Sequence, residues 1–216
     1  NKGPIDWKFH TITGDSVKNT SVQTGGAEQV FLIDLNKDGN IDILSVGIGN
    51  FCKNPPISSN NCGLVWHKNM GDKSFISRYI YESDGLRTVQ ASDMDNDGDI
   101  DIIAGGRHKI IWFENIDNQD FIYYEILAEG DLEVSQVFVA DIDADGDQDV
   151  LAALQLTNTF SWYENINKAD HFIEHIISDK ALGAHDIFAI DIDLDQDLDI
   201  ATASFVGNTV AWYEND

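Results

Sequence analysis

Four short acidic segments contain the residues whose types and spacing point most clearly to chemistry. They occupy residues 34–42, 93–101, 141–149 and 191–199, and every odd position in each segment is Asp or Asn. These positions are Asp34, Asn36, Asp38, Asn40, Asp42, Asp93, Asp95, Asp97, Asp99, Asp101, Asp141, Asp143, Asp145, Asp147, Asp149, Asp191, Asp193, Asp195, Asp197 and Asp199. The segments hold 18 of the 38 acidic residues, so almost half of the acidity lies in copies of one pattern.

The pattern predicts sites for a hard divalent cation. Calcium takes about six to eight oxygen ligands, which one loop can supply from side chains at positions 1, 3, 5 and 9 and the carbonyl of position 7. Without a cation, repulsion among the carboxylates would raise their pKa values. Position 6, where glycine permits a left-handed turn, is Gly39, Gly98, Gly146 and Gln196. We expect up to four Ca²⁺ ions, bound most weakly in the fourth segment; solvated acidic turns are the alternative.

An EF-hand is a second interpretation of these segments, because their first six positions match that loop. Position 12 of an EF-hand loop is a bidentate Glu, but the residues here are Ser45, Ala104, Ala152 and Thr202. The flanking sequences also predict strands, whereas an EF-hand loop lies between helices. The EF-hand interpretation is therefore rejected.

Two further patterns recur with the acidic segments. Trp66, Trp112, Trp162 and Trp212 each begin a W-x-x-N sequence, at spacings of 46, 50 and 50 residues. An aromatic residue followed by two residues, a polar residue, one residue and Ile occurs at 75–80, 121–126, 172–177 and once early, at 7–12. Repeats of this length built from short segments are typical of propellers and solenoids.

Each unit predicts four short strands. In the second unit the apolar and polar residues alternate over 87–93, 100–105, 109–115 and 121–127, and the breaks are rich in Gly, Asn and Asp. A four-stranded antiparallel sheet repeated radially is a propeller blade. The sequence therefore predicts an all-β protein in which each acidic segment joins the first two strands of a blade.

The order of the patterns predicts how the ring closes. The chain begins with a fourth-strand pattern and ends just after a third-strand pattern, and pairing the two would remove an exposed sheet edge. We expect a four-bladed β-propeller forming one domain over 1–216, with blades at about 28–81, 87–127, 134–178 and 185–216, the last completed by 5–12. A solenoid, or part of a ring of six to eight blades, is the alternative.

The composition limits the classes of partner. The chain has 216 residues, 43% of them hydrophobic, and a formal net charge of −25, so it is long enough to bury a sizeable core. Only 13 Lys and Arg are present, too few and too scattered for a surface that binds phosphate backbones or anionic lipids. No apolar run approaches the roughly 20 residues that cross a bilayer. We expect neither nucleic-acid binding nor membrane insertion.

The acidic segments, the strands that follow them and the W-Y-E-N sequence together resemble FG-GAP/VCBS-type repeats, the calcium-bearing propeller repeats also present in integrin α-subunit heads. The resemblance covers nearly the whole chain, and the sequence departs from it at Gln196 and at an insertion over 50–63. It implies an extracellular or cell-surface propeller with Ca²⁺ under each blade, and adhesion or glycan binding on the other face. It identifies no ligand, because propellers carry many functions.

Positions that break the repeat are the candidates for ligand binding. Six residues before each acidic segment stand Glu28, Arg87, Ser135 and His185, which we expect to converge at one axial mouth. Loop residues near this mouth complete the candidate set: Glu28, Phe51, Arg87, Arg107, His108, His185 and Phe205. A solvated channel lining is the alternative. Cys52 and Cys62 flank the insertion and predict a disulfide in an oxidising compartment, with unrelated thiols as the alternative.

These observations support three hypotheses about function. The first is a secreted or cell-surface, calcium-stabilised binding module that recognises a glycan or an extracellular protein on the face opposite the metal loops. The second is a polysaccharide-active lyase or hydrolase that uses His185, Arg87 and Glu28 for acid and base chemistry. The third is a structural module of a larger surface protein. The absence of a nucleophile motif favours binding over catalysis.

Overall fold

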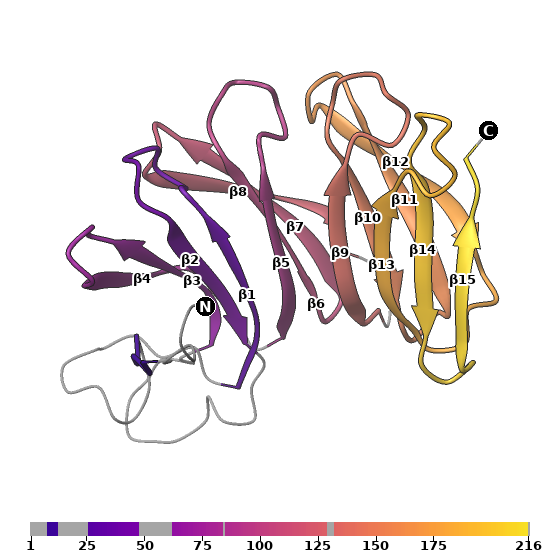
Figure 1. Ribbon diagram of the computed structural model, residues 1–216, viewed down its shortest axis with the longest axis horizontal. Helices are drawn as coiled ribbons and strands as arrows, with labels where there is room; N and C mark the ends of the chain where they lie inside the picture. The colour runs from indigo at the N-terminus through magenta and orange to yellow at the C-terminus, as the bar shows by residue number, and fades with distance from the viewer. Residues whose placement is uncertain (1–7, 13–25, 48–61, 84, 129–131, 216) are drawn as a thin grey trace, which may run out of the picture.

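The protein is built from antiparallel β-sheets arranged side by side in an arc (Figure 1). This computed structural model describes residues 8–12, 26–47, 62–83, 85–128 and 132–215, and contains no helix in them. The first sheet contains β1 (Ala27–Ile33), β2 (Asp42–Gly47), β3 (Gly63–Asn69) and β4 (Phe75–Glu82), and the second contains β5 (Leu86–Ser92), β6 (Asp101–Gly106), β7 (Lys109–Ile116) and β8 (Asp120–Leu127). The third contains β9 (Val134–Ala140), β10 (Asp149–Leu154), β11 (Thr159–Ile166) and β12 (His171–Ser178), and the fourth contains β13 (Ala184–Ile190), β14 (Asp199–Ser204) and β15 (Thr209–Tyr213).

The strands follow one another in space in the order of the sequence. Within each sheet every strand pairs with the next along the chain, and the first strands β1, β5, β9 and β13 contact one another in turn along the arc. The four acidic loops, each joining the first two strands of a sheet, therefore lie along one edge of the arc, at the top of Figure 1. The turns between the second and third strands of the second, third and fourth sheets lie along the opposite edge.

The core lies between neighbouring sheets, because alternate residues of each strand face opposite sides of its sheet. Leu44 and Trp66 of the first sheet pack against Val89 and Ile102 of the second. The same arrangement recurs between the second and third sheets and between the third and fourth. Each interior sheet is therefore buried on both faces by its two neighbours.

The predicted all-β architecture is confirmed, and the strands of the second unit were predicted to within one residue at each end. Ring closure by the N-terminal segment is not confirmed. Among the described residues the fourth sheet has three strands, and residues 8–12 form no strand. His10 and Ile12 instead line a pocket with Gly71 and Phe75 of the first sheet, at the end of the arc away from β15 (Figure 1). The described sheets therefore form an open, propeller-like arc.

Candidate functional site

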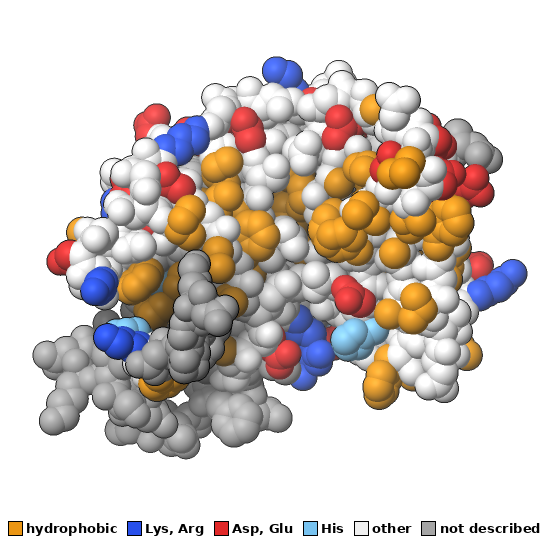
Figure 2. Space-filling view, viewed as in Figure 1, with side chains coloured by type: hydrophobic (Ala, Val, Ile, Leu, Met, Phe, Trp, Pro, Cys, Tyr) orange, Lys and Arg blue, Asp and Glu red, His pale blue; other side chains and the backbone are white. Residues whose placement is uncertain are grey.

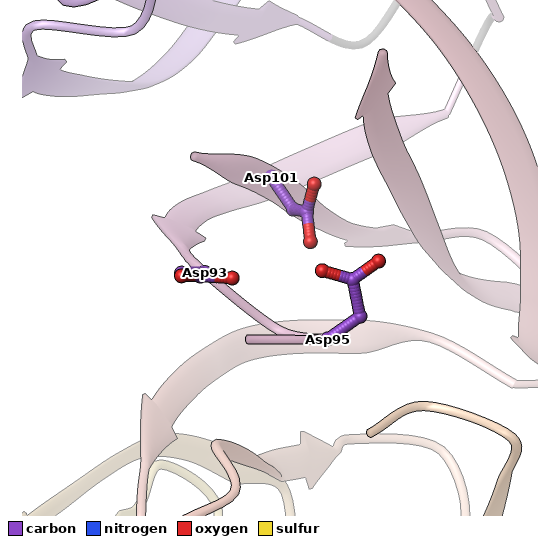
Figure 3. Close-up of side chains that lie close together, drawn as sticks. All are labelled: Asp93, Asp95 and Asp101. Carbon is purple, nitrogen blue, oxygen red and sulfur yellow. The ribbon is translucent and has the colours of Figure 1, made fainter. Parts of the chain in front are cut away.

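Three of the acidic loops each bring three carboxylates together. In the second sheet Asp93, Asp95 and Asp101 each offer one oxygen, and these oxygens lie within 4.8 Å of one another. Figure 3 shows the three side chains pointing toward one another from the ends of β5 and β6 and the loop between them. The equivalent groups are Asp141, Asp143 and Asp149 in the third sheet and Asp191, Asp193 and Asp199 in the fourth. They are positions 1, 3 and 9 of the nine-residue pattern.

The position 9 carboxylate is fixed by the strands around it. Asp101 is the first residue of β6 and is fully buried. Its Oδ1 accepts a hydrogen bond from the backbone N–H of Asn115 at 2.8 Å, and its Oδ2 accepts one from that of Met94 at 3.1 Å. Burial raises the pKa of Asp101 to about 7, although these two hydrogen bonds favour the charged form and lower the pKa. Burial likewise raises the pKa of Asp149 to about 6. A buried carboxylate of this kind is stabilised in its charged form by a cation.

Left-handed backbone at positions 4 and 6 turns each loop around its carboxylates. Gly98 and Gly146 have φ values of 97° and 99°, and the N–H of Gly98 donates to Asp93 Oδ2 at 3.0 Å. Gln196 adopts φ 92° at the same position and donates to Asp191 Oδ2 at 3.2 Å. The fourth loop thus keeps the fold of the others with a residue that strains the backbone, as the sequence predicts.

The carboxylates fit a divalent cation. The Oδ1 atoms of Asp93 and Asp141 are buried and, among the described residues, have no hydrogen-bond partner. An unpaired buried carboxylate oxygen is costly, and a cation held jointly with positions 3 and 9 would satisfy it. All the donors are oxygen atoms, which suit hard cations such as Ca²⁺ and Mg²⁺. These groups could therefore hold a metal ion.

The predicted ligands at positions 5 and 7 do not join these three-residue groups. Asp97 Oδ1 accepts a hydrogen bond from the backbone N–H of Asp99 at 2.7 Å, which tightens the turn. Position 7 links neighbouring loops: Asn96 donates to Asp147 at 2.6 Å, and Lys37 forms an ion pair with Asp99 at 3.3 Å. A role for positions 5 and 7 in metal binding stays a prediction.

The first loop is arranged differently. Asp38 accepts hydrogen bonds from the side-chain amides of Asn36 at 3.0 Å and Asn40 at 2.8 Å, and it lies 3.3 Å from Lys68 Nζ. These donors, chiefly Asn36, lower the pKa of Asp38 to about 2. This loop carries three carboxylates where the second and third carry five, and Lys68 offsets one of them, so a cation has less charge to neutralise here.

Sequence reasoning missed the role of the Asn in the W-x-x-N sequences. The side chain of Asn165 donates to the carbonyl of Gln148 in its own loop at 2.9 Å and to that of Met94 in the preceding loop at 2.8 Å. Asn115 makes the equivalent pair of bonds to Ile100 and Leu35. These residues join adjacent acidic loops, and their constant association with the acidic pattern is the signal that could have identified them.

The opposite edge holds the candidate ligand-binding residues. Glu28, Arg87 and His185, like Ser135, are the extra residues of a β-bulge at the start of an innermost strand, and bulges redirect side chains. Arg87 forms an ion pair with Glu133. The ring of His185 lies 6.2 Å from that of the exposed Phe205. Within the described residues, no hydrogen bond or ion pair joins Glu28, Arg87 and His185.

A pocket of about 430 Å³ lies at the turn between β6 and β7 of the second sheet. Arg107, His108 and Lys109 line it together with Ser83, Gly85, Glu125 and Ala128. His108 has φ 64° and donates its backbone N–H to the carbonyl of Leu132 at 2.9 Å. Phe51 and Cys52 lie outside the described residues. Cys62 is fully buried, and its disulfide with Cys52 stays a prediction.

The fold and the acidic loops define a propeller-like repeat protein with candidate metal sites in its loops. The chain matches the FG-GAP-like repeat over residues 34–104, 93–152 and 141–202, and it belongs to this family. No curated protein matches it.

Among solved structures, the chain is similar to an Agrocybe aegerita lectin that specifically recognises non-reducing terminal N-acetylglucosamine. The two chains share 17% sequence identity and a TM-score of 0.53, over 81% of this chain and 46% of the lectin chain. This likeness shows the fold alone, and the present chain matches less than half of the lectin. In the part of the chain that the structure describes, no helix is long and apolar enough to cross a membrane.

Proposed function

We propose that the chain is a calcium-stabilised binding module of an extracellular or cell-surface protein, and that it recognises a glycan at the edge opposite the acidic loops. The observation that supports calcium most strongly is the pair of buried, unpartnered oxygens on Asp93 and Asp141, each beside two further carboxylates. Ca²⁺ would be held by positions 1, 3 and 9, and its charge would offset their mutual repulsion. The ion's role is to stabilise the loops.

Glycan recognition is proposed for the pocket lined by Arg107, His108 and Lys109. Its side chains offer several hydrogen-bond donors, and Glu125 and Ser83 add acceptors. Sugar hydroxyls need convergent partners of both kinds. The exposed ring of Phe205 lies in the turn between β14 and β15 of the fourth sheet, outside this pocket, and is a separate candidate for contact with the apolar face of a sugar. The fold shared with a glycan-binding lectin supports the same class of ligand. An extracellular location and membership of a larger surface protein belong to this proposal and are supported by the family. The single-domain organisation over 1–216 is proposed with them.

Calcium and glycan binding are tested separately. Thermal unfolding with EDTA and with excess Ca²⁺ should give clearly different Tm values, because an ion that binds only the folded loops stabilises them. Superimposed unfolding curves would remove calcium from the proposal.

A glycan array probed in calcium should then identify a ligand. Arg107→Ala should weaken its binding about tenfold or more, because Arg107 lines the pocket. Lys168→Ala removes an equivalent charge near the acidic loops and should leave binding unchanged. A chain that binds no glycan on the array contradicts the glycan proposal, and equal affinities for the two variants contradict the proposed pocket.

A further inference from the structure

In the part of the chain that the structure describes, the fourth sheet has three strands and no outer strand. In the other three sheets β4, β8 and β12 pair with the third strand, but among the described residues no strand pairs with the outer edge of β15. The unpaired N–H and C=O groups of such an edge form a template for another strand. A partner for β15 would therefore be a single extended segment that adds to the sheet.

The three complete sheets show which residue this segment must carry. The third-strand Trp always faces a planar or cationic group on the outer strand: Arg78 lies 4.8 Å from the ring of Trp66, and Tyr124 stacks on Trp112 at 4.8 Å. His175 stacks on Trp162 at 4.5 Å. In each case the two residues are direct cross-strand partners. Trp66 and Trp112 are 4% and 5% exposed, whereas Trp212 is 46% exposed.

The N-terminal segment carries the required pattern. Residues 7–12 match the outer-strand sequences 75–80, 121–126 and 172–177, and His10 stands at the position of Arg78, Tyr124 and His175. Residues 8–12 nevertheless form no strand, and Phe9 is 91% exposed. They lie beside the first sheet, at the end of the arc away from β15 (Figure 1).

The two ends of the arc also present the two halves of one sheet-to-sheet contact. Val210 is 84% exposed, yet its equivalents Leu64, Ile110 and Phe160 are fully buried by the sheet that follows. At the other end Val30 is 59% exposed, whereas its equivalent Val89 is buried by the sheet that precedes it. Figure 2 shows hydrophobic side chains gathered along the innermost strands and over the fourth sheet. The exposed face of the fourth sheet therefore matches the faces that pack against a following sheet. The exposed face of the first sheet matches the faces that pack against a preceding sheet.

The hydrogen bonds between acidic loops end in the same complementary way. Asn115, Asn165 and Asn215 each donate to a position 2 carbonyl of the preceding loop, those of Leu35, Met94 and Ile142. Asn69 belongs to the first sheet and donates to Ile41 in its own loop. In the described part of the chain, no asparagine side chain donates to the carbonyl of Ile192, the position 2 residue of the fourth loop. The side chain of Asn69, at the first-sheet end of the arc, is thus the donor that would complete the series. The carbonyl of Ile192, at the fourth-sheet end, is the matching acceptor.

We infer that a second copy of this chain completes the fourth sheet. The copies associate head to tail, with the first sheet of one copy following the fourth sheet of the other. Residues 8–12 of each copy pair antiparallel with β15 of its partner copy. The register of the complete sheets places His10 against Trp212 and Lys8 opposite Glu214. This exchange covers Val210 and Trp212 and removes both exposed edges.

The mass of the protein in calcium tests this inference. Light scattering at about 50 µM should give twice the 24.0 kDa of one chain. Val210→Asp blocks the accepting sheet. Ile12→Asp blocks the donated strand, because its equivalents Ile80, Ile126 and Ile177 pack against the core. Each variant alone should therefore be a monomer. An equimolar mixture should form a dimer, because one intact sheet and one intact strand remain between them. Ile122→Asp, an exposed residue on β8, is the control and should stay dimeric.

A cysteine pair keeps the inference testable if an aspartate variant unfolds. The double variant His10→Cys, Trp212→Cys should form a disulfide between two chains under mild oxidation, seen as a dimer on a non-reducing gel. The pair His10→Cys, Ile122→Cys should not. A monomeric wild type, a disulfide within one chain, or variants that remain dimeric alone would each overturn the inference.

Discussion

Replacing Asp101 by Asn should have opposite effects on stability with and without calcium. Asp101 is fully buried at the start of β6, and burial raises the pKa of its carboxyl from 3.8 to about 7. Asn has nearly the same shape and carries no charge. The substitution therefore removes the cost of burying a carboxylate, and it also removes a proposed metal ligand.

The size of the effect follows from the pKa. Between pH 3.8 and about 7 the folded protein holds a proton that the unfolded chain has released, so metal-free stability falls as pH rises through this range. At about 1.4 kcal/mol per pKa unit, a carboxylate fully ionised above pH 7 costs roughly 4 kcal/mol. The Asn side chain can accept the hydrogen bond from the backbone N–H of Asn115 or of Met94, but not both equally well. The weakened bond costs about 1–3 kcal/mol. The net gain is about 1–3 kcal/mol, or several degrees in Tm for a chain of this size.

The assay is thermal unfolding at pH 7.5, in EDTA and in excess Ca²⁺. The Tm of D101N should be higher than that of the wild type in EDTA. In calcium it should be lower, because only the wild type keeps all three carboxylates of the proposed metal site. Asp120→Asn removes one exposed charge from the same sheet and should change neither value appreciably. A lower Tm for D101N in EDTA would refute the reasoning from burial. An unchanged calcium-induced rise in Tm would show that Asp101 does not bind the ion.

Three further substitutions test other parts of the structure. Gln196→Gly should stabilise the fourth loop by about 0.5–1 kcal/mol in urea unfolding, because glycine relieves the strain at φ 92° but loses more entropy on folding; a decrease in stability would contradict the strain. His67 is buried, which lowers its pKa to about 4, so stability should fall by about 3 kcal/mol as pH falls from 6.5 to 4. His67→Gln should flatten that slope, and an unchanged slope would assign it to other groups. Asn165→Ala should lower the free energy of unfolding by about 2–4 kcal/mol, because it removes the hydrogen bonds to the carbonyls of Met94 and Gln148. It should also reduce the calcium-induced rise in Tm, measured by calorimetry, because these bonds join two acidic loops.

Sequence alone predicted the strands and the acidic loops because both are recorded in short, local patterns. Alternation over a few residues gives each strand, and a turn of nine residues gives each group of carboxylates. The hydrogen bonds within the loop were not predictable. The spacing of the acidic residues does not say that Asp97 accepts a bond from Asp99 inside the turn, or that Asp99 pairs with Lys37 of the preceding loop. These contacts depend on the left-handed backbone at Asn96 and Gly98 and on the neighbouring sheet.

The candidate ligand-binding residues illustrate a second limit. The equivalence of Glu28, Arg87 and His185 was visible in the repeat, and the structure shows why it exists: each is the extra residue of a bulge. Whether such residues meet depends on the angles between sheets and on partners from other sheets. Arg87 pairs with Glu133, which precedes the third sheet and carries no repeat pattern that would mark it.

Ring closure depends on these same angles, which explains why a correct count of strand patterns gave an arrangement that the structure does not confirm. The pattern at 7–12 specifies what kind of strand it is, but not which sheet it joins. Besides the cores between the sheets, contacts between acidic loops join neighbouring sheets, since Asn165 joins its own loop to the preceding one. Metal binding and sheet order are therefore coupled: an ion that holds one loop also holds the carbonyl to which the next sheet is attached. Loss of calcium should thus loosen the contacts between sheets before it disrupts the strands within them.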